Sequence, residues 1–477
     1  MDVDRQEEVI QYLQNSVAQA NLRADAYVYD ENRRAQPTRS LYVKLRKYVD
    51  AYLDNESNPR WICLSGVRGV GKTTLLAQLY KATNLPIERK LYLSVDQATR
   101  SLNVSLADIL EAYETILGRV FEQLNDPVIL FLDEVQYEKD WAIILKGVYD
   151  RTKKVLVIAT GSSALSLQTN PDVARRAVFE TLYPMSFCEY MKIVHGKYEI
   201  KSLGKELRKI IFESSTAEEV HRGLLQVQPK VRRYWAGIDR LEIDRYLRYG
   251  TLPFAIGLKN EGLAYEQMKK TIDRVIDTDI RQMGNFSNEV ITKIGAVLYA
   301  VAGSDSISLT KLAGILGLSK DSLSEVFQML EKSETLFRVY PYGSPYTQVR
   351  KPSKYLFASP AFRSMYFNFI GQVQQGDNLK GRLLEDLAGV YIRRYLQMRP
   401  NPSMSYDSAQ GGADLIVGFG HERIIMEIGW GAKGFRQVDN TAKRVSAKYK
   451  LSISQTSLKI SDDKTSVNIP LAYFLLT

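Results

Sequence analysis

The spacing of apolar residues predicts a chain that begins with helices and continues as strands alternating with helices. Residues 5–20 and 40–53 carry apolar side chains at helical spacing. Strand-like runs follow at residues 60–64, 89–96, 128–132 and 153–159, and the apolar stretches at 128–132 and 153–159 are typical of parallel strands buried on both faces. Helical patterns separate these runs. The alternation predicts an α/β domain with a parallel sheet over residues 1–190.

Three further regions follow this predicted sheet. Residues 191–300 have helical patterns and are predicted to form a helical lid. Residues 301–370 are predicted to form a winged-helix domain, because two short amphipathic helices precede two strand-like runs, at residues 308–316, 320–332, 335–340 and 354–357. Residues 371–477 are predicted to form a second α/β domain, with a helix from about Gly381 and strands at 412–417 and 423–429.

A glycine-rich loop lies between the first predicted strand and the helix after it. From Gly66 to Thr73 it matches the phosphate-binding pattern G-x-x-x-x-G-K-[ST] in full. In this pattern the glycines let backbone N–H groups surround phosphate, the lysine reaches the β and γ phosphates, and the threonine hydroxyl binds Mg²⁺. The sequence therefore predicts a site for ATP and Mg²⁺ formed by Gly66, Val67, Arg68, Gly69, Val70, Gly71, Lys72, Thr73 and Thr74.

Polar residues at the ends of two later strands complete the predicted site. Asp133 and Glu134 directly follow the apolar run at 128–132. Asp133 is predicted to hold Mg²⁺ through its water shell, and Glu134 to orient and deprotonate the attacking water. Thr160 and Ser162 follow the run at 153–159 and are candidates to contact the γ-phosphate or the water. Helix capping by Ser162 is an equally good interpretation.

Several of these motifs occur together in one known family. The glycine loop, Leu132–Gln136, Ala159–Ser163, the arginine before Pro184–Phe187, and Tyr246–Pro253 resemble the AAA-type ATPases of bacteria and archaea that carry a C-terminal domain of unknown function. The resemblance implies an AAA-type P-loop fold and Mg²⁺-dependent ATP hydrolysis. It also implies that Arg176 is an arginine finger or sensor, which with Lys72 and Glu134 makes up the predicted catalytic residues. Arg176 lies beyond the strand at 153–159, where it could complete a neighbour's site, so a homo-oligomer is a further hypothesis. A surface salt bridge is the alternative for Arg176.

The predicted winged helix offers candidate contacts to DNA. Lys320 and Ser322 begin its second helix and are expected to enter a groove, and three basic residues, Arg350, Lys351 and Lys354, are expected to reach phosphates from the wing. The alternative is that this domain contacts only protein.

The last domain resembles the restriction-endonuclease-like fold. Glu385 on a helix, with Asp414 and Glu427 at adjacent strand ends, is similar to the pattern D…(D/E)-x-K. Gly429 stands where the lysine is expected, and Lys433, four residues later, could substitute for it only by reaching back. The three carboxylates are predicted to hold a divalent ion at most, because losing the lysine removes an electrostatic term that catalysis needs. We therefore expect a degenerate site without nuclease activity.

Composition narrows the classes of function. The chain has 64 Lys and Arg against 54 Asp and Glu, which favours an acidic partner such as DNA. The absence of a long apolar run or a signal peptide predicts a cytoplasmic protein without a membrane span. The preferred hypothesis is ATP hydrolysis coupled to conformational change on or near DNA. The alternatives are a signal-transduction-type ATPase switch that recruits protein partners, and an ATP-dependent nuclease.

Overall fold

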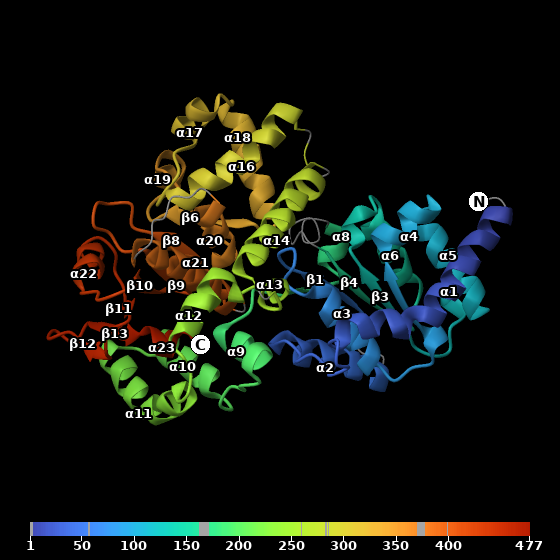
Figure 1. Cartoon of the computed structure of the whole chain (residues 1–477), viewed down its shortest axis with the longest axis horizontal. Helices are drawn as coiled ribbons and strands as arrows, with labels where there is room; N and C mark the ends of the chain where they lie inside the picture. Colours follow the sequence, from blue (N-terminus) through green and yellow to red (C-terminus); the bar gives the residue numbers. More distant parts are fainter. Residues whose placement is uncertain are drawn as a thin grey trace. The chain divides into compact units, whose positions relative to one another are not determined.

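The computed structural model describes residues 3–55, 58–161, 171–258, 260–281, 284, 286–369, 377–397 and 399–477. The chain forms two compact units (Figure 1). The N-terminal unit contains residues 1–183 with residues 332–334, and the C-terminal unit contains residues 184–331 and 335–477.

The N-terminal unit is built on a five-stranded parallel sheet with the strand order β2-β3-β4-β1-β5. Its strands are β1 (Trp61–Ser65), β2 (Lys90–Ser94), β3 (Val128–Asp133), β4 (Val155–Thr160) and β5 (Val178–Thr181). The first four confirm the predicted parallel sheet. The fifth was not predicted, because its four residues are few and only partly apolar.

Helices pack on this sheet, and the alternation of side chains decides which helix meets which face. The helices of this unit are α1 (Val3–Val28), α2 (Ser40–Asn55), α3 (Lys72–Ala82), α4 (Val95–Leu102), α5 (Leu106–Leu117), α6 (Trp141–Arg151) and α8 (Pro171–Ala174). Trp61 and Cys63 of β1 are fully buried in a cluster with side chains of α1, α4, α5, α6 and α8, whereas Tyr80 of α3 packs against Phe131 and Tyr92 with ring centroids 5.6 and 5.3 Å apart.

The C-terminal unit is mostly helical along its first half. The region predicted as a lid contains α9 (Phe187–His195), α10 (Leu203–Glu213), α11 (Ala217–Trp235), α12 (Leu241–Arg245), α13 (Pro253–Ile256), α14 (Glu261–Arg274) and the start of α16 (Asn288–Gly303). The predicted winged helix and last domain contain α17 (Leu309–Leu316), α18 (Lys320–Lys332), α19 (Pro345–Arg350), α20 (Pro360–Phe369), α21 (Asp377–Leu396), α22 (Arg436–Ala442) and α23 (Leu471–Phe474). None of the helices in the described ranges is long and apolar enough to cross a membrane.

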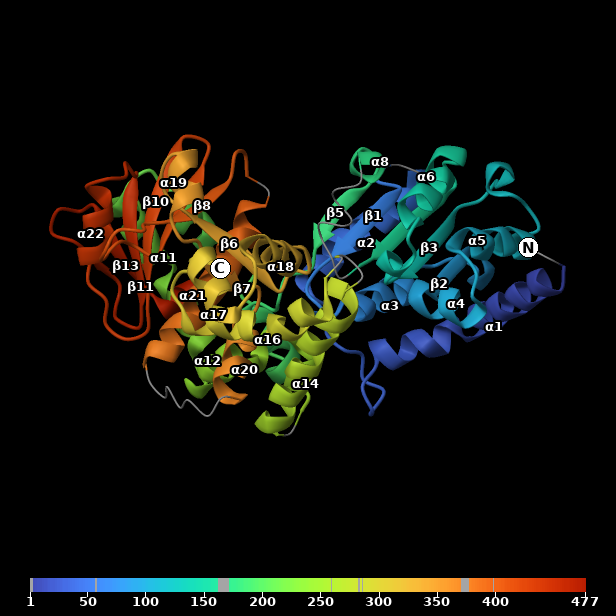
Figure 2. The same cartoon turned by 90° about the horizontal axis from the view of Figure 1, so that it is seen from above.

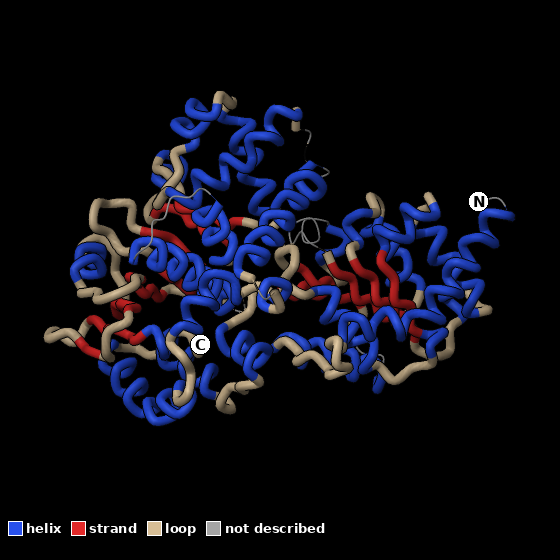
Figure 3. Tube along the Cα trace, viewed as in Figure 1, coloured by secondary structure: helices blue, strands red, loops and turns tan. Residues whose placement is uncertain are grey.

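One eight-stranded sheet runs through the rest of this unit, in the order β12-β13-β11-β10-β9-β8-β6-β7 (Figures 2 and 3). Its strands are β6 (Leu336–Pro341), β7 (Lys354–Phe357), β8 (Ser403–Tyr406), β9 (Leu415–Phe419), β10 (Glu422–Ile428), β11 (Tyr449–Ser454), β12 (Lys459–Ile460) and β13 (Ser466–Pro470). β6 pairs antiparallel with β7, as a wing does, and also parallel with β8. The predicted division at residue 370 therefore falls inside one continuous sheet.

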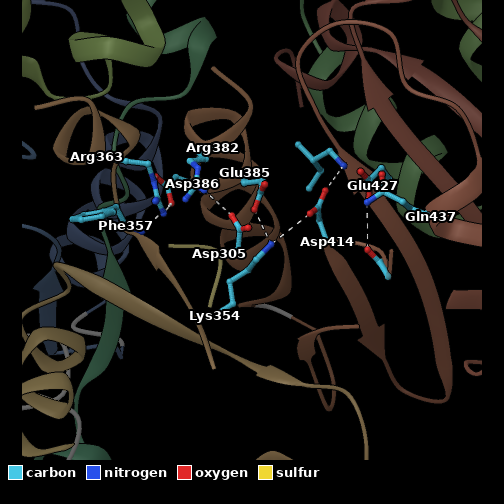
Figure 4. Close-up of polar contacts among 12 residues, drawn as sticks. Asp305, Lys354, Phe357, Arg363, Arg382, Glu385, Asp386, Asp414, Glu427 and Gln437 are labelled. Atoms are coloured by element: carbon cyan, nitrogen blue, oxygen red, sulfur yellow. Dashed lines mark hydrogen bonds and ion pairs between the residues drawn. The ribbon is translucent and has the colours of Figure 1, made fainter. Parts of the chain in front are cut away.

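A buried ion pair joins this sheet to its helices. The Arg363 guanidinium donates to both carboxylate oxygens of Asp386, at 2.6 and 2.9 Å, and to the carbonyl oxygens of Val301 and Ala302. Asp386 also accepts a hydrogen bond from the backbone N–H of Phe357 at 3.0 Å (Figure 4). The pair thus ties α16, α20, α21 and β7 together.

Candidate nucleotide site and carboxylate cluster

The glycine loop connects the end of β1 to the start of α3. Gly66 has φ of 149°, and a Cβ atom there would lie 2.4 Å from the carbonyl oxygen of Leu182. Gly71, which precedes α3, has φ of 100°. Residues with side chains rarely adopt either backbone conformation, so glycine is required at both positions. The loop consequently brings its N–H groups to the positive end of α3, where an anion is stabilised.

Lys72 lies over this loop. Its ammonium group donates to the carbonyl oxygen of Gly66 at 2.8 Å and approaches that of Val67 at 3.5 Å, and the residue is only 5% exposed. A buried cation held only by backbone carbonyl oxygens remains available to an anion, because no carboxylate neutralises it within hydrogen-bonding distance among the described residues. Contact between Lys72 and phosphate stays a prediction.

Asp133 and Glu134 are joined to the loop by a chain of hydrogen bonds. The Thr73 hydroxyl donates to one oxygen of Asp133 at 2.8 Å, and the Thr160 hydroxyl donates to the other. The backbone N–H of Glu134 in turn donates to the Thr160 hydroxyl at 3.2 Å. The structure thus brings together four of the predicted site residues. Ser162 lies outside the described residues.

Burial is the main cause that raises the pKa of Asp133, and the neighbouring charge of Glu134 raises it further. Hydrogen bonds from Thr160 and Thr73 act in the opposite direction. The carboxylate is therefore only partly compensated by the protein. A hydroxyl and a carboxylate oxygen side by side are hard oxygen donors, and they fit Mg²⁺ bound together with phosphate oxygens and water.

Glu134 is held in an unusual backbone conformation. Its φ of 57° and ψ of 45° place it in the left-handed region, which residues other than glycine seldom adopt. Its carboxylate accepts a hydrogen bond from the side chain of Gln136. Backbone strain of this kind concentrates at functional sites.

Arg39 supports the loop, although the sequence analysis did not single it out. It is buried, and its guanidinium donates to the carbonyl oxygen of Val70 at 2.9 Å and to that of Tyr183 at 2.7 Å. It thereby fixes the loop to the segment after β5. No local pattern marks Arg39, because its two partners are 31 and 144 residues away along the chain.

Arg176 forms an ion pair at the surface. Its guanidinium donates twice to the carboxylate of Asp150 on α6, at 2.8 and 2.9 Å. Within one chain this is the salt bridge that the sequence analysis gave as the alternative. A role as an arginine finger stays a prediction. Arg68 of the loop donates to the hydroxyl of Tyr137 at 3.1 Å.

Three of the predicted DNA contacts are exposed, and the other two, Ser322 and Lys354, already bond to other residues of the protein. Lys320, Arg350 and Lys351 are exposed. Ser319 caps α18, because its hydroxyl accepts the backbone N–H of Ser322 at 3.0 Å and lies 2.8 Å from the Ser322 hydroxyl. The side chain of Ser322 is therefore already engaged.

Lys354 requires a correction. It was predicted to reach DNA phosphates from the wing, but only 7% of it is exposed. Its ammonium group donates to Glu385 of α21 at 2.7 Å and lies 3.5 Å from Asp414, which precedes β9. Lys354 begins β7, and the continuation of the sheet through β6 and β8 carries it into the core. Figure 4 shows Lys354 pointing between the two carboxylates.

The three predicted carboxylates belong to one polar cluster. Asp414 also accepts the backbone N–H of Ile428 at 2.9 Å. Burial raises the pKa values of Glu385 and Glu427, and raises the pKa of Asp414 to about 6. Within the described parts of the chain, no three His, Cys, Asp or Glu side chains are arranged to hold a metal ion. The cation present between Glu385 and Asp414 is instead the ammonium group of Lys354.

Lys433 occupies the space that Gly429 leaves open. A Cβ atom at Gly429 would lie 1.9 Å from Cε of Lys433. The Lys433 ammonium group reaches Glu427 at 3.1 Å. The expected sequence position, residue 429, has no lysine. Lys433, four residues later, reaches back over Gly429 and places its ammonium group beside Glu427.

Known proteins are similar to this chain in sequence. Residues 58–191 match the model of an AAA domain, and residues 240–370 match the model of a domain of unknown function (DUF8612). The uncharacterized protein MJ1637 of Methanocaldococcus jannaschii is 34% identical over 441 residues, which cover 91% of this chain and 88% of that protein. The chain belongs to the family of this archaeal protein. Because the AAA match contains the glycine loop and the Asp133–Glu134 pair, the N-terminal unit of this family member is an AAA-type P-loop ATPase domain.

More distant similarities are weaker. The uncharacterized protein MJ1544 of the same organism is 18% identical over 338 residues, which cover 69% of this chain and 65% of that protein. Among solved structures, the Orc1 protein of Aeropyrum pernix in complex with DNA has a TM-score of 0.32 and 12% identity, covering 70% of this chain and 93% of that one. The AMPPCP-bound DnaA of Aquifex aeolicus has a TM-score of 0.27 and 16% identity, covering 62% and 89%.

Proposed function

We propose that this protein hydrolyses ATP with Mg²⁺ and couples hydrolysis to conformational change on or near DNA. The observation that carries the proposal is the hydrogen-bonded chain from Thr73 through Asp133 and Thr160 to Glu134, beside the glycine loop. It holds a cation-binding carboxylate and a general base at fixed positions relative to the phosphate loop. A loop that only bound nucleotide would not require the second carboxylate.

In this proposal each residue of the hydrogen-bonded series, and Lys72 beside it, has a separate role. Thr73 and Asp133 hold Mg²⁺, which neutralises phosphate charge when it is bound. Lys72 exchanges its carbonyl partners for phosphate oxygens. Glu134 accepts the proton of the attacking water. Thr160 touches both acidic residues through hydrogen bonds, so a change at the γ-phosphate can be passed along this chain to β4.

Lys72→Ala is expected to weaken ATP binding by about tenfold or more, because it removes a charge-assisted hydrogen bond to phosphate. Lys81→Ala is the matched control, since Lys81 lies on the same helix and pairs with Asp25 at 2.8 Å. Titration of each variant with a fluorescent ATP analogue measures the dissociation constants. Equal affinity in the two variants would show that the loop does not hold phosphate as proposed.

The proposal of DNA as partner rests on exposed charge around α17 to α19. The net charge of the chain is +10. Arg350 ends α19, which lies between the paired strands β6 and β7 along the chain. Lys351 directly follows this helix, and Lys320 begins α18. Two large apolar side chains of α19, Tyr346 and Val349, are 82% and 84% exposed. Apolar side chains beside arginine occur where proteins insert into the minor groove of DNA.

The salt dependence of DNA binding tests this surface. Replacing Arg350 and Lys351 together by alanine is expected to lower the slope of log K against log salt by about one unit for each phosphate that the variant no longer binds. Lys269→Ala/Lys270→Ala on α14 is the control, because both lysines pair with acids on their own helix. Fluorescence anisotropy with a duplex over a range of salt concentrations gives the slopes. An unchanged slope would assign this surface to a protein partner.

Stimulation of ATP turnover by DNA tests the coupling itself. Turnover is expected to rise when duplex, single-stranded or branched DNA is added. ATPase activity without any response to DNA would favour the signal-transduction-type switch. We also propose that copies of the chain assemble so that Arg176 completes a neighbour's site. DNA cleavage is not proposed, because the ammonium group of Lys354 lies between the carboxylates that a metal ion would need.

A further inference from the structure

The C-terminal unit contains a basic cavity that the proposed ATPase site does not use. Its volume is about 420 Å³, within the range of about 300–1,000 Å³ that is usual for small-molecule pockets. Helix α10 contributes Lys205, Arg208 and Lys209, and the end of α21 and the residues after it contribute Arg394 and Arg399. Glu213 is the one side-chain carboxylate among the residues that line it.

The side chains that line this cavity carry an excess of positive charge, with five Lys or Arg against the single carboxylate of Glu213. Glu213 is already engaged by an ion pair with Arg399 and by the Tyr395 hydroxyl at 3.4 Å. Among the described residues, Arg394 pairs only with Glu189, at 3.7 Å, and the same oxygen of Glu189 also accepts the backbone N–H of Ser186 at 3.0 Å. Arg394 is therefore weakly compensated.

Arg208 has still less compensation. It is half-buried, and among the residues that the structure describes none forms an ion pair or hydrogen bond with its guanidinium. Burial is the largest cause that lowers the pKa of Arg208, and the like charge of Arg394 lowers it further. The negative charge of Glu199 acts in the opposite direction and raises this pKa. Arg208 and Arg394 line the same cavity and repel each other, so an anion that binds there relieves an unfavourable interaction between like charges.

The aromatic residues of the cavity narrow the class of ligand. The rings of Phe212 and Tyr395 stack on each other with centroids 4.5 Å apart. The guanidinium of Arg399 lies 4.5 Å from the centre of the Tyr395 ring. The Tyr391 hydroxyl accepts the backbone N–H of Phe187 at 2.8 Å. Because these aromatic side chains already contact each other, Arg399 or the backbone, the cavity offers a ligand positive charge and not a free ring on which a base could stack.

The helix that carries Arg208 is held in place from the sheet. The Tyr449 hydroxyl donates to the carbonyl oxygen of Ile211 at 2.9 Å, and the Lys448 ammonium group donates to that of Phe212 at 3.2 Å. The arginine therefore lies on a supported element, as a binding residue requires.

From this geometry we propose that the cavity binds a phosphate group through Arg208 and Arg394, with Lys205 and Lys209 at its rim. Guanidinium groups suit phosphate because they present several N–H donors in a planar fork. The phosphate comes either from the end of a nucleic-acid strand or from a small phosphorylated molecule. This site does not depend on ATP hydrolysis.

The test uses the full chain carrying Lys72→Ala, so that binding at the glycine loop is weakened in every sample. Arg208→Gln is compared with Arg222→Gln, which removes an exposed arginine of α11 outside the cavity. The probes are inorganic phosphate and a short single-stranded oligonucleotide with or without a 5′-phosphate. Thermal unfolding and fluorescence anisotropy give the readouts.

Inorganic phosphate is expected to raise the unfolding temperature of the Arg222→Gln protein and not that of the Arg208→Gln protein. Without ligand, Arg208→Gln is expected not to lower that temperature, because it removes a poorly compensated charge. A preference of about tenfold for the 5′-phosphorylated strand, lost in Arg208→Gln, would identify the strand end as the source. Stabilisation by phosphate without that preference would identify a small phosphorylated molecule.

Equal responses of the two variants to phosphate would overturn the proposal. If Arg208→Gln fails to fold, Lys205→Gln/Lys209→Gln serves instead, because both lysines are exposed. This pair is expected to weaken phosphate binding by several-fold, and an unchanged affinity would contradict the proposal equally.

Discussion

Turnover of ATP is expected to fall by about 10²–10⁴-fold in Glu134→Gln, while ATP binding stays unchanged. The amide keeps the shape of the carboxylate and can still accept the hydrogen bond from Gln136, but it cannot take a proton from water. The backbone N–H of residue 134 continues to donate to Thr160, so the chain of hydrogen bonds to Asp133 is preserved. The variant is therefore expected to bind ATP and retain it.

Steady-state phosphate release and ATP-analogue titration, made on the same preparations, separate the two effects. Glu111→Gln is the control, because Glu111 is an exposed residue of α5 and is not placed in the site. Loss of binding in Glu134→Gln would mean that residue 134 supports the loop and does not act as a base. Normal turnover in this variant would remove Glu134 from the mechanism altogether.

The nucleotide site could be predicted from sequence because its parts are local. The glycine loop lies within eight residues, from Gly66 to Thr73, and the Asp133–Glu134 pair directly follows a buried apolar run. The parallel order of the strands then brings these parts to one edge of the sheet. Arg39 could not be predicted, because the carbonyl groups of Val70 and Tyr183 to which it donates reach it only through folding.

The C-terminal unit could be predicted less well, because its sheet is assembled from distant segments. The sequence indicated a short wing at 354–357, where a lysine would be exposed. Pairing of β6 with β8 extends the sheet and buries Lys354 beside residues 31 and 60 positions later in the chain. Lys433 likewise fills the space above Gly429 only because the segment after β10 turns back.

Lys354→Ala is expected to lower the free energy of unfolding by about 3–5 kcal/mol, because it leaves buried carboxylates without their cation. Lys351→Ala is the matched control: Lys351 is exposed, and its ammonium group donates only to Ser408 at 2.9 Å among the described residues. Denaturant titrations of both variants and the wild-type protein measure the difference. A loss below about 1 kcal/mol would show that Lys354 does not compensate the cluster, since that is the usual size of a surface ion pair.

Two further measurements on Lys354→Ala distinguish charge compensation from lost packing. The pKa of Asp414 already lies above its ordinary value of 3.8, at about 6, and losing Lys354 removes an influence that lowers it. The folded protein therefore binds this proton more tightly than the unfolded chain does, and the free energy of unfolding should fall as pH rises from about 4 through 6. In Lys354→Ala the pKa of Asp414 lies higher still, so this fall should extend to higher pH. The deficit of Lys354→Ala should therefore be smaller at pH 5 than at pH 8.

Mg²⁺ or Mn²⁺ should also restore part of the stability of Lys354→Ala at pH 8, because Glu385 and Asp414 can then bind a hard cation in place of the ammonium group. A deficit that changes with neither pH nor divalent ions would mean that the Lys354 side chain contributes through packing alone.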